Sequence, residues 1–166
     1  MIQLLFVRYL YILVLVSFAS AFGSKDSLLF SCITVSRSLN FDYSVNLTSR
    51  SSAFWDPVCN YEPIIGTLTT CLYEHSDSKN SYEYLLSKYA SGCNENSATD
   101  LTPKILINSY KNASSYILID TPKDDEKIHN PIKLDLKSVD TVNNSFKAFF
   151  LNITISTSYA VICIFF

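Results

Sequence analysis

The first 21 residues have the pattern of a secretory signal peptide. They carry one charge, Arg8, and residues 10–18 form a mostly apolar block of nine residues. Ala19, Ser20 and Ala21 follow as a small-residue cleavage motif. The apolar block is too short for a membrane span, which needs about 20 residues. We therefore expect residues 1–21 to direct export and to be cleaved, with an uncleaved membrane anchor as the alternative.

Export determines how the cysteines are interpreted. Cys32, Cys59, Cys71 and Cys93 follow the predicted signal peptide, and Cys163 lies in an apolar C-terminal stretch. In an oxidising compartment the first four predict two disulfides, for which three pairings are possible. None of them is spaced from another as zinc ligands usually are.

A break in the helical pattern near residues 77–78 gives a weak preference among the three pairings. If two antiparallel helices meet there, Cys59 and Cys93 lie at comparable distances before and after the turn. Cys71 is then left for Cys32. We favour Cys59–Cys93 together with Cys32–Cys71.

Composition indicates a folded domain and excludes several functions. Hydrophobic residues make up 48% of the chain, which argues against disorder. The net charge of −2 lacks the basic excess typical of nucleic-acid binding. Gly23, Gly66 and Gly92 are too scattered to form a phosphate-binding loop. Since no nucleophile motif or acidic pair is evident either, we predict no catalytic residue, no nucleic-acid partner and no small-molecule substrate.

Helical periodicity begins at Pro63, a residue suited to a first helical turn, and continues to residue 72. A second helical stripe covers residues 82–93 and is closed by Gly92. Thr102 and Pro103 begin a third helix, with Leu106, Tyr110, Ala113 and Ile117 on one face. Residues 28–40 show no clear pattern, and residues 51–60 are interpreted as a loop that contains Pro57. The tyrosines at positions 82, 84 and 89 are interpreted as core and surface aromatics.

The C-terminal stretch 148–166 contains no charge, and Lys147 is the last charged residue. Its strongly apolar part, residues 159–166, spans only about 12 Å as a helix. One interpretation is a marginal span from Ala148, and another is a span that longer relatives complete. A third is a lipid-anchor signal near residues 143–145, which lacks the usual polar spacer. Each interpretation makes the membrane the expected partner.

These patterns predict a mostly α protein. The signal peptide, residues 1–21, precedes a small disulfide-stapled helical ectodomain of residues 22–120. A charged linker, residues 121–138, leads to a helix of residues 139–166 that runs into an incomplete transmembrane segment.

Four glycosylation sequons support an extracellular location, because each has Ser or Thr two residues after the asparagine. They lie at Asn46, Asn112, Asn143 and Asn152. Asn152 is close to the apolar end, which makes it the weakest of the four.

Both histidines lie beside acidic residues. Glu74, His75 and Asp77 form one group, and His129 follows the acidic residues 124–126. Metal binding is one interpretation, but oxygen ligands without preorganised geometry bind poorly. We interpret both groups as solvated and predict no metal site.

Five short motifs occur in a distinctive order after the signal peptide and an early cysteine. They are Pro-Val-Cys-Asn-Tyr-Glu-Pro (57–63), Thr-Cys-Leu-Tyr-Glu (70–74), Ala-Ser-Gly-Cys (90–93), Asn-Ser-Tyr (108–110) and Asn-Ala-Ser-Ser-Tyr (112–116). In this order they resemble the N-terminal extracellular domain of the fungal (yeast) ferric/cupric reductase transmembrane components. The resemblance covers residues 32–166.

The resemblance implies a plasma-membrane lineage linked to iron homeostasis. Members of that family reduce Fe(III) or Cu(II) with NADPH, FAD and two haems that are held by paired histidines on membrane helices. No position here matches those histidines, because His75 and His129 lie outside the apolar ends, and no flavin or nicotinamide motif is present.

We therefore predict a truncated ferric-reductase-like glycoprotein in the secretory pathway, at the plasma membrane or on the cell surface. It would bind no haem, FAD or NADPH, and this favours a protein that is not an enzyme. The alternative is a secreted or surface-anchored glycoprotein with a binding or structural role.

Overall fold

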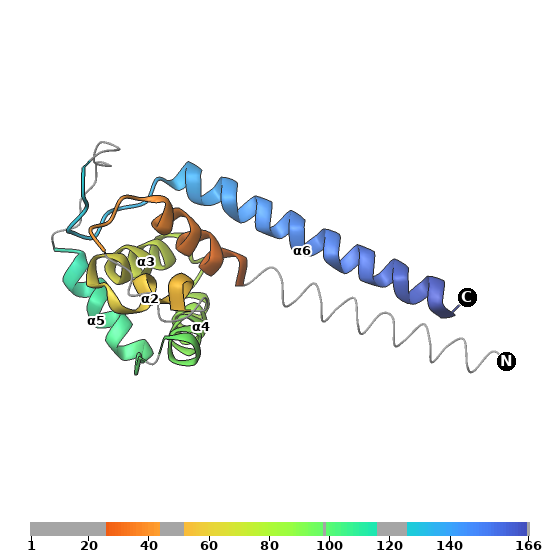
Figure 1. Ribbon diagram of the computed structural model, residues 1–166, viewed down its shortest axis with the longest axis horizontal. Helices are drawn as coiled ribbons and strands as arrows, with labels where there is room; N and C mark the ends of the chain where they lie inside the picture. The colour runs from red at the N-terminus through yellow and green to blue at the C-terminus, as the bar shows by residue number, and fades with distance from the viewer. Residues whose placement is uncertain (1–25, 44–51, 98, 116–125, 166) are drawn as a thin grey trace.

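The computed structural model describes residues 26–43, 52–97, 99–115 and 126–165, and gives only the helical backbone for residues 153–165. The expected signal peptide, Asn46 and Ile117 therefore lie outside the described residues. Within these ranges the chain is mostly helical, as expected (Figure 1). Residues 26–38 are helical. The helices that follow are α2 (Ser52–Asn60), α3 (Glu62–His75), α4 (Lys79–Asn96), α5 (Pro103–Ala113) and α6 (Leu136–Phe165).

Helix α3 is the centre of the domain and contacts α2, α4 and α5. Every residue from Ile64 to Leu72 is buried, which is typical of a helix surrounded by protein on all sides. Its threonines are compatible with burial because their hydroxyls bond to the helix itself. Thr69 Oγ1, for example, donates to the Ile65 carbonyl at 2.9 Å.

Gly66 allows two other segments to approach α3 closely. A Cβ atom at this position would lie 2.8 Å from Pro131 Cγ and 3.0 Å from Ala113 Cβ. Alanine favours a helix by about 1 kcal/mol over glycine. The glycine therefore lowers the intrinsic helix propensity of α3, but it permits close packing of α5 and of the chain around Pro131.

The prediction that Gly92 closes the second helix is wrong. Helix α4 continues to Asn96, and a Cβ atom on Gly92 would lie 2.5 Å from Cη2 of Trp55. The glycine thus provides room for the Trp55 ring against the side of α4. Packing between helices accounts for this residue, whereas the local pattern suggested a helix end.

The prediction of a loop over residues 51–60 is also wrong, because α2 occupies most of it. Pro57 has no N–H and so cannot bond to the carbonyl of Ala53, four residues earlier. Arg37 Nη2 donates to that carbonyl across a long 3.5 Å bond, and its guanidinium carbon lies 4.5 Å from the centre of the Phe54 ring. A distant residue therefore compensates for the proline.

The described part of the expected charged linker packs on the domain. Ile128, Ile132 and Leu134 are buried, whereas the polar residues Lys127, His129 and Asp135 are exposed. Ile128 forms a parallel β-bridge with Phe41, and the backbone N–H of Ile132 donates to Thr67 Oγ1 of α3 at 2.9 Å. The segment therefore belongs to the core, and its charged residues obscured the apolar pattern in the sequence.

Helix α6 begins at Leu136, three residues before the expected start, and extends away from the other described helices (Figure 1). Val139 is fully buried, and the Phe146 ring lies 6.3 Å from that of Phe30. Further along, the side chains of Phe149 and Leu151 are both 57% exposed. Over the part of the chain that the structure describes, no helix has both the length and the apolar character to cross a membrane. The incomplete transmembrane segment therefore stays a prediction.

Candidate functional site

Cys32, Cys59, Cys71 and Cys93 form two disulfides, as the sequence predicts. Cys32 is bonded to Cys71, which joins the helix of residues 26–38 to α3, and Cys59 is bonded to Cys93, which joins α2 to α4. This is the favoured pairing of the three. All four residues are at most 2% exposed. Loops of this size give a stabilisation of about 2–5 kcal/mol per disulfide.

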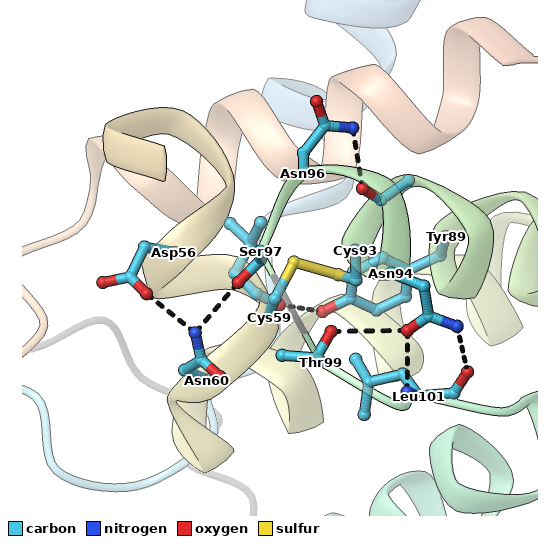
Figure 2. The surroundings of a disulfide bond; sticks show 12 residues. Asp56, Cys59, Asn60, Tyr89, Cys93, Asn94, Asn96, Ser97, Thr99 and Leu101 are labelled. Atoms are coloured by element: carbon cyan, nitrogen blue, oxygen red, sulfur yellow. Dashed lines mark hydrogen bonds between the residues drawn. A yellow bond between two sulfur atoms is a disulfide. The ribbon is translucent and has the colours of Figure 1, made fainter. Parts of the chain in front are cut away.

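Figure 2 shows that hydrogen bonds surround the Cys59–Cys93 disulfide on the α2 and α4 sides. Asn60 Nδ2 donates to Asp56 Oδ1 at 2.7 Å and to Ser97 Oγ at 3.0 Å. Asn94 accepts from the backbone N–H of Leu101 at 2.8 Å and donates to its carbonyl at 2.9 Å. The cluster fixes the ends of α2 and α4, and we assign it a structural role.

The interpretation of His75 as a solvated helix end is wrong. Its side chain is only 6% exposed. The imidazole Nδ1 lies 3.7 Å from Asp140 Oδ1 of α6, and Nε2 is buried without a hydrogen-bond partner among the described residues. By contrast, the side chain of His129 is 64% exposed, as expected, and its Nδ1 lies 3.5 Å from Asp42 Oδ2.

A cavity of about 610 Å³ lies beside His75, and we call it the His75 cavity. Its walls come from Leu28 of the helix of residues 26–38, the end of α3, the loop into α4, the first two turns of α4 and one face of α6. Asn143 of α6 lines it, and Asn143 Oδ1 is likewise buried with no hydrogen-bond partner among the described residues. The other polar residues that line it are Asp77, Ser78, Asn80, Ser81, Tyr84 and Lys147.

A second cavity of about 590 Å³ is lined by Tyr73, Tyr82 and Tyr110, and we call it the tyrosine cavity. The Tyr73 and Tyr110 rings stack with centroids 4.5 Å apart, so each covers a face of the other. Burial, followed by the neighbouring Tyr110 and Tyr73, raises the pKa of Tyr82 to about 12. Tyr82 and Tyr89 are buried and Tyr84 is exposed, which confirms the core and surface interpretation of the three tyrosines at 82, 84 and 89.

Of these two cavities, the His75 cavity is the better candidate site. Charged and polar side chains from several elements line it, among them His75, Asp77, Asn143 and Lys147. The sequence interpretation missed it because its walls come from α3, α4 and α6. One feature of the sequence could have indicated the site: the spacing of Asp140, Asn143 and Lys147 places them on one face of a helix.

The predicted glycosylation sites that the structure describes differ in how accessible they are. Asn112 is exposed in the last turn of α5, and Asn152 is exposed on α6. Asn143 instead faces the His75 cavity. Cys163 belongs to the part of α6 for which only the backbone is described.

Within the described ranges, no group of three or more His, Cys, Asp or Glu side chains is placed to hold a metal ion. No protein-family model matches the chain, and no curated protein or solved structure matches it. The candidate site is therefore defined by its own geometry.

Proposed function

We propose that this chain acts as a ferric-reductase-like ectodomain at the cell surface, delivered through the secretory pathway and held at the plasma membrane by α6. The continuity of α6 is the observation that carries the proposal. One 30-residue helix packs on the domain through Val139 and Phe146 and then continues to Phe165.

The charge distribution along α6 supports membrane attachment. Lys147 is the last charged residue, and residues 148–165 are free of charge. As a helix this stretch is about 27 Å long at ~1.5 Å per residue, somewhat shorter than the ~30 Å thickness of a bilayer core, and we propose that it enters the lipid as an incomplete span. A single rigid element would therefore connect the folded domain to the lipid.

The buried disulfides support the proposed location, because disulfides persist in extracellular and luminal compartments. Three of the five motifs behind the resemblance contain disulfide cysteines, namely Cys59, Cys71 and Cys93. This supports a shared stapled scaffold. We assign the ectodomain no electron-transfer step, because the resemblance locates haem, FAD and NADPH chemistry in other parts of the family's members.

Alkaline carbonate extraction of membranes from yeast that express the full chain tests the attachment. We expect the wild-type chain to stay in the membrane pellet and Ile155→Lys to shift to the soluble fraction, because Ile155 lies near the middle of the charge-free stretch and a charge near the bilayer centre costs about 3 kcal/mol or more. Ile105→Lys is the matched control, since Ile105 is 47% exposed on α5.

Release of the wild-type chain into the medium would contradict the attachment and support the alternative, a secreted binding glycoprotein. The His75 cavity is the observation that favours this second candidate. A haem absorbance band in the same membranes, above that of cells without the chain, would contradict an ectodomain without electron transfer.

A further inference from the structure

We propose that Tyr73 and Tyr110 form a site of oxidative cross-linking, at which hydrogen peroxide and a haem peroxidase join α3 to α5 through a dityrosine bond. The inference goes beyond the proposed function and rests on it only for the supply of oxidant outside the cell. Three observations carry it: the stacking of the two rings, the exposure of one of them, and the place of α5 outside both disulfides.

The two rings are in contact although they come from different helices. Tyr73 lies in the last turn of α3 and Tyr110 near the end of α5, and their ring centroids are 4.5 Å apart with an interplanar angle of 27°. Groups that a fold holds together react far faster with one another than with the same groups in solution. Two tyrosyl radicals formed here would therefore couple within one chain.

Exposure determines which ring meets the oxidant first. Tyr73 is 52% exposed, more than any other tyrosine that the structure describes. Burial, the neighbouring Tyr73, a hydrogen bond with its hydroxyl and the Glu74 carboxylate raise the pKa of Tyr110, so this phenol is protonated at neutral pH. Through the bond between the hydroxyls, Tyr110 can pass a hydrogen atom to a Tyr73 radical. Tyr73 is then oxidised a second time, which leaves a radical on each ring.

Tyr82, the third ring of the tyrosine cavity, is a poorer reactant. It is 7% exposed, and its hydroxyl is buried without a hydrogen-bond partner among the described residues. Oxidation of a protonated phenol releases a proton together with the electron, and the Tyr82 hydroxyl has no acceptor there. Its ring also meets that of Tyr73 edge-on, at a centroid distance of 5.4 Å. We therefore expect the bond to join Tyr73 to Tyr110.

The reaction balances with peroxide as the only oxidant. Each phenol gives one electron and its hydroxyl proton to the peroxidase cycle, in which one molecule of hydrogen peroxide is reduced to two molecules of water. The two radicals form one carbon–carbon bond between ring positions next to the hydroxyls. The hydrogens at those two positions then move to the oxygens, which restores both phenols. The cross-linked chain is lighter by two hydrogen atoms.

The bond would give α5 a covalent tether. The two disulfides join the helix of residues 26–38 to α3 and α2 to α4, so neither of them includes α5. The loop between Tyr73 and Tyr110 is similar in length to the loops that the disulfides close. A cross-link of this kind constrains the unfolded chain, and we expect it to raise Tm by about 5 °C or more.

Mass spectrometry of the purified full chain tests the site. The chain in non-ionic detergent is treated with hydrogen peroxide and a haem peroxidase, then reduced and digested with trypsin. We expect a fluorescent peptide pair that joins residues 51–79 to residues 105–111 and has lost two hydrogen atoms. Its yield should not depend on protein concentration, because both rings belong to one chain. Absence of this pair, or an equal yield from the chain unfolded in urea, would overturn the proposal.

Tyr73→Phe and Tyr110→Phe are the site variants, and Tyr84→Phe is the matched control. Phenylalanine keeps the ring but forms no phenoxyl radical, so either site variant should remove the peptide pair. Tyr84 is 38% exposed on α4, and its substitution should leave the yield unchanged. Residues 51–79 also contain Tyr61, whose ring centroid lies 5.3 Å from that of Tyr43. A peptide pair that survives in Tyr73→Phe would therefore contradict the assignment.

Peroxide-treated yeast that expresses the full chain tests the supply of oxidant. We expect the same peptide pair in the chain isolated from these cells. Formation of the pair with the purified enzyme but not in the cells would overturn cross-linking at the cell surface. Since carbonate extraction does not depend on either tyrosine, failure here is distinguishable from failure of the membrane attachment.

Discussion

At the scale of single residues, two buried tyrosines of α4 have different hydrogen-bonding environments. The Tyr89 hydroxyl donates to the Val58 carbonyl of α2 from a fully buried position. Tyr82 is 7% exposed, but its hydroxyl has no partner among the described residues. A buried hydroxyl is stabilising when it is bonded and unfavourable when it is not.

Phenylalanine substitutions separate the two environments. We expect Tyr89→Phe to lower the free energy of unfolding by about 1–3 kcal/mol, because it leaves the Val58 carbonyl unsatisfied. Tyr82→Phe should change it by less than about 0.5 kcal/mol or raise it, since only an unpaired hydroxyl is lost. Urea denaturation at neutral pH measures both. A larger loss in Tyr82→Phe than in Tyr89→Phe would contradict the hydrogen-bond assignment.

At the scale of elements, the helices depend on neighbours that are distant in the sequence. Pro57 is tolerated inside α2 because Arg37 donates to the carbonyl that the proline leaves free. Gly66 is tolerated inside α3 because Pro131 and Ala113 occupy the space a side chain would take. In both cases tertiary contacts outweigh local helix propensity.

Gly66→Ala tests this balance. Helix propensity alone predicts a gain of about 1 kcal/mol, whereas overpacking typically costs about 1–3 kcal/mol. We expect a net decrease of about 1–2 kcal/mol in the free energy of unfolding, measured by urea denaturation. Ser87→Ala, at an exposed position of α4, is the control and should change it by less than about 0.5 kcal/mol. A more stable Gly66→Ala variant would show that Pro131 moves away easily.

At the scale of the whole molecule, α6 brings Asp140 and Asn143 beside the end of α3. The Lys133 Nζ–Glu74 Oε1 pair at 2.7 Å holds the chain to α3 just before α6 begins. His75 and Asn143, which are remote in sequence, come to line one cavity as a result. The same arrangement makes two of the described sequons differ in accessibility, because Asn112 is exposed and Asn143 faces that cavity.

Glycosylation in yeast should reflect this arrangement. We expect Asn112→Gln to increase the gel mobility of the secretory form by one glycan, and Asn143→Gln to leave it unchanged, because a glycan at Asn143 would occupy the His75 cavity. Endoglycosidase treatment of each variant is the control, since all forms should then migrate together. A glycan found at Asn143 would contradict the packing of α6 beside His75.

The sequence by itself determined the features that depend on local pattern. The helix start at Thr102 and Pro103 is confirmed, and the Thr102 hydroxyl accepts from the backbone N–H of Ile105. Pro63 lies in the first turn of α3 as expected. Cysteine number and the predicted export were enough to predict two disulfides, and the small number of possible pairings of four thiols made a preferred pairing possible.

Only the tertiary structure decided the rest. Whether a glycine closes a helix or accommodates a tryptophan, and whether His75 is solvated or buried, depends on which element covers it. The apolar residues of segment 126–135 belong to the core because α3 and residue 41 lie against them. The sequence alone does not show this contact. Hydrophobic burial is non-directional, so the sequence shows that a residue can be buried but not which partner buries it.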